Sequence, residues 1–359
     1  MLLKHQWQKL LEIQQIQMDF MEELMRRIPN IRRMKTLGKP SMSPSQTRGF
    51  KSRIHRHSPL PIYFSLLTLL CLFGPGPAAS QDQPQLFEQL VGSEFSYLVQ
   101  KGDSLVGIGA RFGVNGGFLA ASNQLSPTSP LKAGQSLRVD NRHIVPDIIN
   151  DGIVINIPQR MLFYFKERRL VRSFPVGLGR HDWPTPTGPF KIVEKEKNPN
   201  WDVPTSIQEE MRREGKAVKT CVPPGPDNPL GKHWLGLSIG GYGIHGTIAP
   251  KSIYQFQTHG CVRAHADDIA QLFDDVSHGT PGMLIYRPLL VARIGQQVYL
   301  EVHRDVYKKG PDALRRFEPI LRTFNLESVI DRDLAQDIIR RQEGIAREIT
   351  RRIGATNSR

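Results

Sequence analysis

The segment His245-Gly-Thr-Ile-Ala-Pro-Lys-Ser-Ile-Tyr-Gln-Phe-Gln-Thr-His-Gly-Cys-Val-Arg263 places two histidines and one cysteine within nineteen residues. A cysteine attacks a carbonyl as its thiolate, so it needs a nearby base or positive charge that lowers its pKa. His259 lies two residues before Cys261, and a hairpin-like return would bring His245 opposite it. Gly260 lets the backbone turn so that successive N–H groups face one point, as a tetrahedral oxyanion requires. The segment predicts a nucleophile with its base.

Two other interpretations of these residues stay open. Zinc bound by His245, His259 and Cys261 is the first, although the usual Cys-x2-Cys or His-x3-His pairing is missing. The second is a buried cysteine with two unrelated histidines, which the surrounding Gly and Thr residues make less favoured. We therefore expect neither a metal nor a cofactor.

The distribution of charge separates the first part of the chain from the rest. The chain has 359 residues and a formal net charge of +14. Residues 1–57 hold twelve Lys and Arg against four Asp and Glu, so the remainder carries only about +6, without a dense basic run. This distribution argues against nucleic acid as a partner.

Residues 51–80 have the order of a secretory signal peptide. A basic stretch precedes twelve uncharged, mostly apolar residues from Ile62 to Phe73, and small residues follow up to Ser80. The apolar stretch is shorter than the roughly 20 residues that span a bilayer. We expect cleavage after Ser80, a periplasmic protein and no stable membrane span after cleavage. Residues 1–50 are interpreted as an extension or a misplaced gene start.

Export leaves Cys221 and Cys261 as the cysteines of the mature chain. A disulfide framework needs more cysteines than this in a chain of such length. Cys221 lies in a proline-rich loop without a base nearby in sequence, and we interpret it as structural or incidental.

Residues 96–141 predict a small domain of two strands around two helices. This stretch resembles a LysM module at Tyr97-x-Val99, Gly102-Asp103-Ser104-Leu105, Phe112-Gly113-Val114, Asn123 and Leu131-x-x-Gly134-Gln135-x-Leu137. The resemblance implies binding to glycan that contains N-acetylglucosamine, most simply peptidoglycan. The resemblance implies that Gly102, Asp103 and Ser104 reach the glycan-binding groove of the LysM family. The alternative is that these residues only build the domain.

The second domain, residues 152–287, is rich in β-branched and aromatic residues separated by Pro and Gly turns, which predicts strands. One amphipathic helix follows Cys261, with Ile269, Leu272 and Phe273 on its apolar face. Residues 288–303 are expected to close this domain as a β-hairpin. Residues 311–352 are expected to form a helical C-terminal extension.

The stretch GIHGTIAPKSIYQFQTHGCVR resembles the signature of the L,D-transpeptidase (YkuD-like) family. The likeness continues upstream through TPTGPF and VPPGPDNPLGKHWLGLSIGGYGIHGT, and downstream through DDIAQLFDDVSHGTPGMLIY. It implies a mainly β, β-sandwich-like catalytic domain. Combined with the LysM module in an exported chain, it resembles the ErfK-like periplasmic type.

The same resemblance assigns roles to individual residues. Cys261 would be the nucleophile and His245 the general base, with a backbone carbonyl at Gly246 orienting the imidazole. His259 and Gly260 would contribute to the oxyanion environment with Cys261. The residues expected to bind substrate are Arg263, whose guanidinium suits a carboxylate, Tyr242 and Thr258.

The expected function is a peptidoglycan L,D-transpeptidase that acts in cell-wall organisation and cell shape. The cysteine would acylate at the third residue of a tetrapeptide stem, usually meso-diaminopimelate, and release D-alanine. The acceptor would be another stem, which gives a 3-3 cross-link, or an envelope lipoprotein. An L,D-carboxypeptidase, a cell-wall endopeptidase and an inactive glycan-binding scaffold remain alternatives. Papain-like endopeptidases place Cys before His, and here His245 precedes Cys261.

Overall fold

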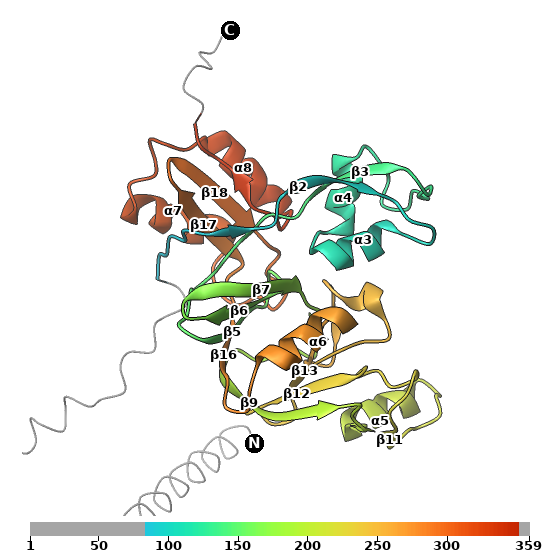
Figure 1. Cartoon of the computed structure of the whole chain (residues 1–359). Coiled ribbons are helices and arrows are strands. Elements are labelled where there is room, and N and C mark those ends of the chain that lie inside the picture. Colours follow the sequence, from blue (N-terminus) through green and yellow to red (C-terminus); the bar gives the residue numbers. More distant parts are fainter. Residues whose placement is uncertain (1–82, 352–359) are drawn as a thin grey trace, which may run out of the picture. The chain divides into compact units, whose positions relative to one another are not determined.

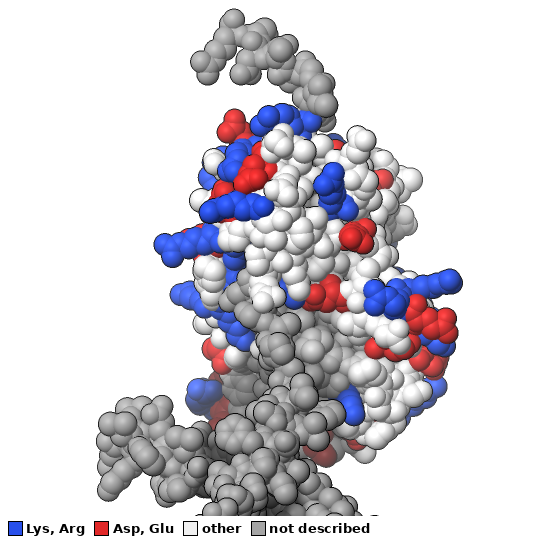
Figure 2. Space-filling model, turned by 90° about the vertical axis from the view of Figure 1, so that its left-hand side faces the viewer, with Lys and Arg blue, Asp and Glu red and all other residues white. Residues whose placement is uncertain are grey.

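The computed structural model describes residues 83–351 (Figure 1). The expected extension at residues 1–50 and the expected signal peptide at residues 51–80 lie outside this range. Within residues 83–351, no helix is long and apolar enough to cross a membrane. On the face shown in Figure 2, Lys and Arg side chains are interspersed with Asp and Glu.

An eight-stranded mixed sheet forms the centre of the second domain, in the order β15-β13-β12-β9-β16-β5-β6-β7. Its members in chain order are β5 (Gly152–Asn156), β6 (Met161–Lys166), β7 (Arg169–Pro175), β9 (Gly188–Lys197), β12 (His233–Leu237), β13 (Gly243–His245), β15 (Val262–Arg263) and β16 (Pro281–Ile285). Most neighbours are antiparallel, but β16 runs parallel to β5 and β13 runs parallel to β15. The prediction of a mainly β protein is confirmed.

Strand β5 shows why the sheet is buried on both faces. Successive side chains of a strand point to opposite faces. Ile153 and Ile155 enter the main core, which helix α6 (Ala266–Asp275) covers, whereas Val154 enters a second core on the other face. Because both faces are covered, the three central residues of the strand, Ile153 to Ile155, are all apolar instead of alternating with polar residues.

The small N-terminal module contains the expected two strands and two helices: β2 (Glu94–Leu98), α3 (Leu105–Phe112), α4 (Gly116–Ser122) and β3 (Ser136–Asp140). Ser104 caps α3, because its Oγ accepts from the Gly107 N–H at 3.2 Å. Gly113 ends the helix with a φ of +73°. The module has a core of its own, built from residues such as Leu105, Leu119 and Leu137.

The C-terminal region differs from the expectation. The hairpin of β17 (Leu289–Ile294) and β18 (Gln297–Val302) does not join the eight-stranded sheet, but pairs with β19 (Arg347–Glu348) in a sheet of three strands. Helices α7 (Ala313–Thr323) and α8 (Arg332–Arg341) pack on it and share its core. The hairpin carries apolar residues on both faces, so it needs a cover of its own. Residues 311–352 are therefore helical only in part.

Short elements complete the fold: β1 (Leu90–Val91) with β4 (His143–Ile144), β8 (Leu178–Gly179) with β14 (Phe256–Thr258), the 3-10 helix η3 (Pro250–Ser252), and an insertion of β10 (Trp201–Asp202), α5 (Thr205–Arg213) and β11 (Cys221–Val222). Helix α5 buries none of its residues. It is therefore held by polar contacts rather than by an apolar face.

Candidate active site

Neighbouring strands bring the two ends of the His245–Arg263 segment together. Strands β13 and β15 are paired in parallel, with His245 opposite Arg263. Cys261 directly precedes β15, two residues before Arg263, and it lines the same cavity as His245 and Arg263. The three side chains therefore lie on one side of the sheet.

A cavity of about 390 Å³ lies on that side. It is lined by six of the residues that the sequence singled out, namely Tyr242, His245, Thr258, His259, Cys261 and Arg263. The insertion supplies further walls through Trp201, Pro204 and Ile207. Gly246 and Gly260 adjoin His245, His259 and Cys261 in the chain but are not lining residues themselves.

His245 is held in one orientation and one tautomer. Its side chain is buried, and Nδ1 lies 2.6 Å from the carbonyl oxygen of Gly246. A carbonyl only accepts, so Nδ1 carries the proton and Nε2 is left as the acceptor. Burial, and next the positive charge of Arg263, lower the pKa of His245 to about 3, against the smaller opposing effect of backbone carbonyls. The imidazole is neutral at physiological pH.

The thiol of Cys261 is also neutral in the resting structure. Burial raises its pKa, and the Gly243 N–H and the charge of Arg263 offset this only in part. Sγ lies 3.8 Å from the carbonyl oxygen of Gly241. The sequence reasoning expected a neighbouring base or cation to lower this pKa. The structure gives the opposite direction, because the loss of hydration outweighs the nearby charge.

The turn that carries the cysteine is fixed by Thr258. Its hydroxyl donates to the carbonyl oxygen of Cys261 at 2.6 Å and accepts from the N–H of Gly260 at 3.1 Å. Gly260 has a φ of +104°, and a Cβ there would lie 2.6 Å from a ring carbon of Tyr242. Only glycine fits this position. The Gly260 N–H is thus already engaged within the turn, and Tyr242 forms part of the cavity wall against it.

The imidazole of His259 points to the insertion. Its Nε2 donates to the carboxylate of Glu210 on α5, and the other carboxylate oxygen accepts from Arg180 at 2.7 Å. Trp183 packs edge-on against the same imidazole, with ring centroids 4.8 Å apart. The hydrogen bond from Arg180 is the main cause that lowers the pKa of Glu210. Helix α5 is therefore tied to the catalytic turn through one carboxylate.

Arg263 presents donors to the cavity. Its backbone is fixed by reciprocal hydrogen bonds with Gly177, at 2.8 and 2.9 Å. Its Nε is buried and has no hydrogen-bond partner among residues 83–351. Buried polar groups without a protein partner are rare, so this nitrogen is an exception among the buried groups of the domain.

Two ring nitrogens that could bind zinc in this site are hydrogen-bonded to other groups of the protein. Nδ1 of His245 is bonded to Gly246, and Nε2 of His259 is bonded to Glu210. In the part of the chain that the structure describes, the group able to bring three ligand atoms within 4.8 Å of one another is a different one, His143, Glu301 and His303. Those residues do not line the catalytic cavity.

Two of the three residues expected to contact glycan, Asp103 and Ser104, have structural partners within the module. Asp103 accepts from the hydroxyl of Tyr97 and from the N–H of Gln100, both at 2.8 Å. Ser104 caps α3, and Gly102 is an exposed turn residue with a φ of +92°. Cys221 is free and exposed, away from the cavity lining.

A thiol and a neutral imidazole with a fixed acceptor nitrogen, facing one cavity, are the parts of a cysteine-dependent acyltransferase. Residues 150–284 match the family model of the L,D-transpeptidase catalytic domain, and residues 97–140 match the LysM domain. The chain belongs to the L,D-transpeptidase family, and its activity is that of a peptidoglycan L,D-transpeptidase with a cysteine nucleophile.

Relatives extend over most of the chain. The probable L,D-transpeptidase YcfS of Escherichia coli is 32% identical over 286 residues, which cover 76% of this chain and 87% of that protein. The probable L,D-transpeptidase ErfK/SrfK of Salmonella typhimurium is 31% identical over 281 residues, which cover 75% and 90%. Among solved structures, the Ldtfm-avibactam carbamoyl enzyme aligns with a TM-score of 0.32 and 19% identity over 39% of this chain and 50% of that chain.

Proposed function

We propose that Cys261 attacks the carbonyl of the third residue in a tetrapeptide stem, usually meso-diaminopimelate, and forms a thioester. The thiol proton passes to Nε2 of His245 during the attack and then to the amine of the departing D-alanine. An amine acceptor then breaks the thioester. A second stem as acceptor gives a 3-3 cross-link, and a lysine of an envelope lipoprotein gives an attached protein.

The observation that carries this proposal is the fixed tautomer of His245. With Nδ1 bonded to the Gly246 carbonyl, Nε2 is the nitrogen left to take a proton. The pKa values of His245 and Cys261 are shifted so that both groups are neutral at rest. Proton transfer and sulfur attack therefore belong to one step, and His245 acts as a general base.

Arg263 is proposed to bind a carboxylate of the stem peptide. Its buried Nε has no partner in the described part of the chain, and a guanidinium pairs with carboxylates through parallel hydrogen bonds. Tyr242 and Thr258, which shape the cavity and the turn, would position the peptide rather than take part in proton transfer.

Glu210 is proposed as a positioning residue for His259. Its carboxylate joins the imidazole to Arg180, and α5 has no buried side chain that would hold it otherwise. The pair keeps the wall formed by the insertion next to the turn that carries Cys261. His259 would then contribute to the oxyanion environment from a fixed position.

We further propose that the protein works in the periplasm after removal of residues 51–80, in peptidoglycan biosynthesis. The LysM module would raise the local concentration of glycan strands near the active site. This assignment is supported by the order of basic, apolar and small residues in that segment.

The test is incubation of residues 81–359 with tetrapeptide muropeptides, followed by mass spectrometry. A dimer formed with loss of D-alanine is the expected product. Loss of D-alanine without a dimer would indicate an L,D-carboxypeptidase, and cleavage of existing cross-links an endopeptidase. No change with the wild-type chain would indicate a glycan-binding scaffold.

A further inference from the structure

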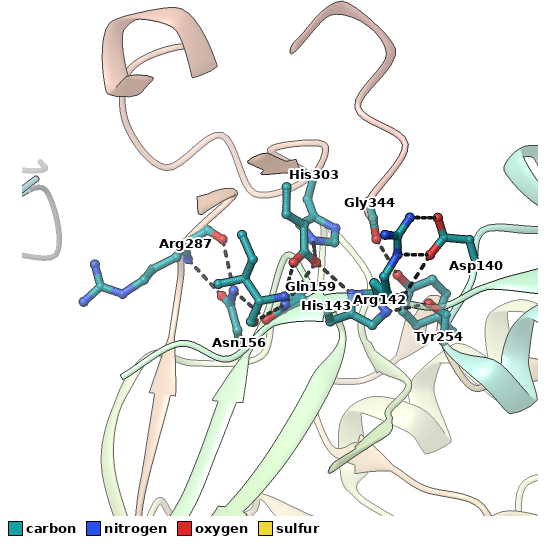
Figure 3. A network of polar contacts seen from close by, with 12 residues as sticks. Asp140, Arg142, His143, Asn156, Gln159, Tyr254, Arg287, His303 and Gly344 are labelled. Atoms are coloured by element: carbon teal, nitrogen blue, oxygen red, sulfur yellow. Dashed lines mark hydrogen bonds and ion pairs between the residues drawn. The ribbon is translucent and has the colours of Figure 1, made fainter. Parts of the chain in front are cut away.

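A buried polar cluster lies outside the catalytic cavity (Figure 3). We call His143, Gln159, Glu301 and His303 the docking cluster. All four are at most 3% exposed. They come from β4, from the turn after β5, and from the end of β18 and the residue that follows it. The cluster therefore joins three separate parts of the chain.

Glu301 is surrounded by hydrogen-bond donors. Its Oε1 lies 2.8 Å from Nδ1 of His143, 2.8 Å from Nε2 of His303 and 3.0 Å from Nε2 of Gln159. Its Oε2 accepts from the N–H of Ile144 at 2.6 Å. Burial alone would raise the pKa of Glu301, but the charge and hydrogen bond of His143, followed by the hydrogen bond of His303, lower it to about 2. The carboxylate is ionised.

His143 carries the matching positive charge. Its Nε2 lies 2.8 Å from the carbonyl oxygen of Gly113, which only accepts, so Nε2 is protonated. Nδ1 faces the ionised carboxylate of Glu301, so it is protonated as well. The hydrogen-bond partners on both sides make this buried residue an imidazolium.

The carbonyl that His143 contacts is at the C-terminal end of helix α3. Gly113 is the capping residue of that helix. The last carbonyls of a helix lack partners within it, and the negative end of the helix dipole favours a cation. His143 satisfies one of these carbonyls and supplies a cation there.

A second imidazole satisfies a neighbouring carbonyl of the same helix. Nε2 of His265 lies 3.0 Å from the carbonyl oxygen of Ala110. Beside it, Arg111 forms a bidentate pair with Asp267, at 3.0 and 2.7 Å. Two elements of the catalytic domain, the segment before α6 and its first turn, therefore hold the end of α3 from another side.

We infer that the docking cluster fixes the LysM module on the catalytic domain, so that the module is a rigid part of the enzyme rather than a tethered one. The segment between them supports this. Residues 141–147 connect the module to the catalytic domain, and His143, Ile144 and Val145 among them are buried, while β4 pairs with β1. Glycan held by the module would meet the catalytic cavity in a fixed geometry.

A metal ion is the competing explanation of the cluster. The ligand atoms of His143, Glu301 and His303 lie close enough for one. Four N–H groups already face the Glu301 carboxylate, however, three at Oε1 and one at Oε2. Hydrogen bonds therefore account for the contacts of Glu301 and His143, while the buried Nδ1 of His303 has no hydrogen-bond partner among residues 83–351.

Hydrogen exchange tests the inference on residues 81–359. His143→Gln removes the charge and weakens the contact to Gly113, so we expect amides in residues 141–147 and in the last turn of α3 to exchange at least about tenfold faster. Amides of β12, which β9 and β16 separate from β5 in the sheet, should be unchanged. His278→Gln, which changes an exposed histidine, is the matched control.

Arg111→Ala provides a second variant that leaves the buried cluster intact, in case His143→Gln prevents folding. It removes an exposed ion pair at the same helix end and should loosen α3 in the same direction by a smaller factor. Unchanged exchange in α3 in both variants would overturn the inference. Stoichiometric metal in the purified wild-type chain, lost in His143→Gln, would also overturn it. Neither readout depends on transpeptidase activity, so failure here is distinguishable from failure of the proposed function.

Discussion

His245 in the catalytic cavity and His143 in the docking cluster are both buried, yet His245 is neutral whereas His143 carries a positive charge. His245 contacts a carbonyl through one nitrogen and has the cation Arg263 nearby, so burial leaves it neutral. His143 contacts a carbonyl through one nitrogen and the carboxylate of Glu301 through the other, so it keeps both protons. The comparison teaches that the partner of the second nitrogen decides whether a buried histidine serves as a base or as a structural cation.

The largest expected effect is at the nucleophile. Cys261→Ser should lower transfer at least about a thousandfold, because neutral His245 is matched to a thiol rather than to a serine hydroxyl. Cys221→Ser, at the exposed free cysteine, should retain wild-type activity. The measurement is dimer formation from muropeptides. Equal inactivity of two folded variants would contradict the assignment of Cys261 and indicate a link between the cysteines.

His245→Ala should lower acylation by a carbapenem about 10²- to 10⁴-fold, since the general base is lost. In the wild type, the acylation rate should stay level from pH 7 to pH 5. The pKa of His245 is lowered to about 3, so the imidazole gains its proton only below that interval. If the acylation rate fell to half near pH 6.5, His245 would have the pKa of an ordinary histidine. That result would contradict its description as a buried histidine that stays neutral.

Glu301→Gln tests the second half of the comparison, the positive charge on His143. Removing the carboxylate leaves the imidazolium of His143 buried without a counter-charge, which costs about 3–5 kcal/mol of unfolding free energy. Glu318→Gln, in a solvent-exposed pair with Arg332, should cost at most about 1 kcal/mol. Denaturant unfolding at pH 7 measures both. Equally small losses of unfolding free energy in Glu301→Gln and Glu318→Gln would contradict a charged docking cluster.

The same cluster predicts a pH dependence of stability. The folded pKa of Glu301 lies below its ordinary value of 4.5, at about 2, so its stabilisation is present above pH 4.5. It is lost as the pH falls through that interval towards 2. In Glu301→Gln, this part of the acid dependence should disappear from the denaturant midpoints. If the denaturant midpoints of the wild type and of Glu301→Gln fell identically as the pH is lowered, the dependence would belong to other carboxylates.

The smallest effect is expected at Glu210. Glu210→Gln should slow acylation about tenfold, because the amide replaces charge-assisted hydrogen bonds to His259 and Arg180. The pH profile of Cys261 alkylation should not move, which separates this role from that of His245. Glu209→Gln, its exposed neighbour on α5, is the matched control. An equal effect of both substitutions would remove the positioning role.

The sequence was informative where chemistry is local. The His-Gly-Thr and Thr-His-Gly-Cys-Val-Arg stretches predicted which residues meet at the cavity, because parallel strands carry them to adjacent positions. The two strands and two helices expected in residues 96–141 are also present in the structure. These features depend on residues a few positions apart.

Long-range partners were not predictable in the same way. Glu210 is 49 residues from His259, and Glu301 is 158 residues from His143. The sequence around the charged residues of the insertion and of the hairpin contains no local pattern that predicts their partners. The hairpin at residues 288–303 carries apolar residues on both faces, a pattern that fits either sheet, so only the packing of α7 and α8 assigns it. The direction of the Cys261 pKa also depends on burial, which spacing does not report.

The most direct test of the neutral catalytic pair is the pH dependence of Cys261 alkylation by iodoacetamide in the Cys221→Ser form of residues 81–359. Because burial raises the pKa of the thiol above its ordinary value of 9.0, the rate should climb about tenfold per pH unit through pH 8 and level off only above pH 9. A plateau of high reactivity between pH 5 and pH 7 would reveal a preformed thiolate–imidazolium pair and contradict the account.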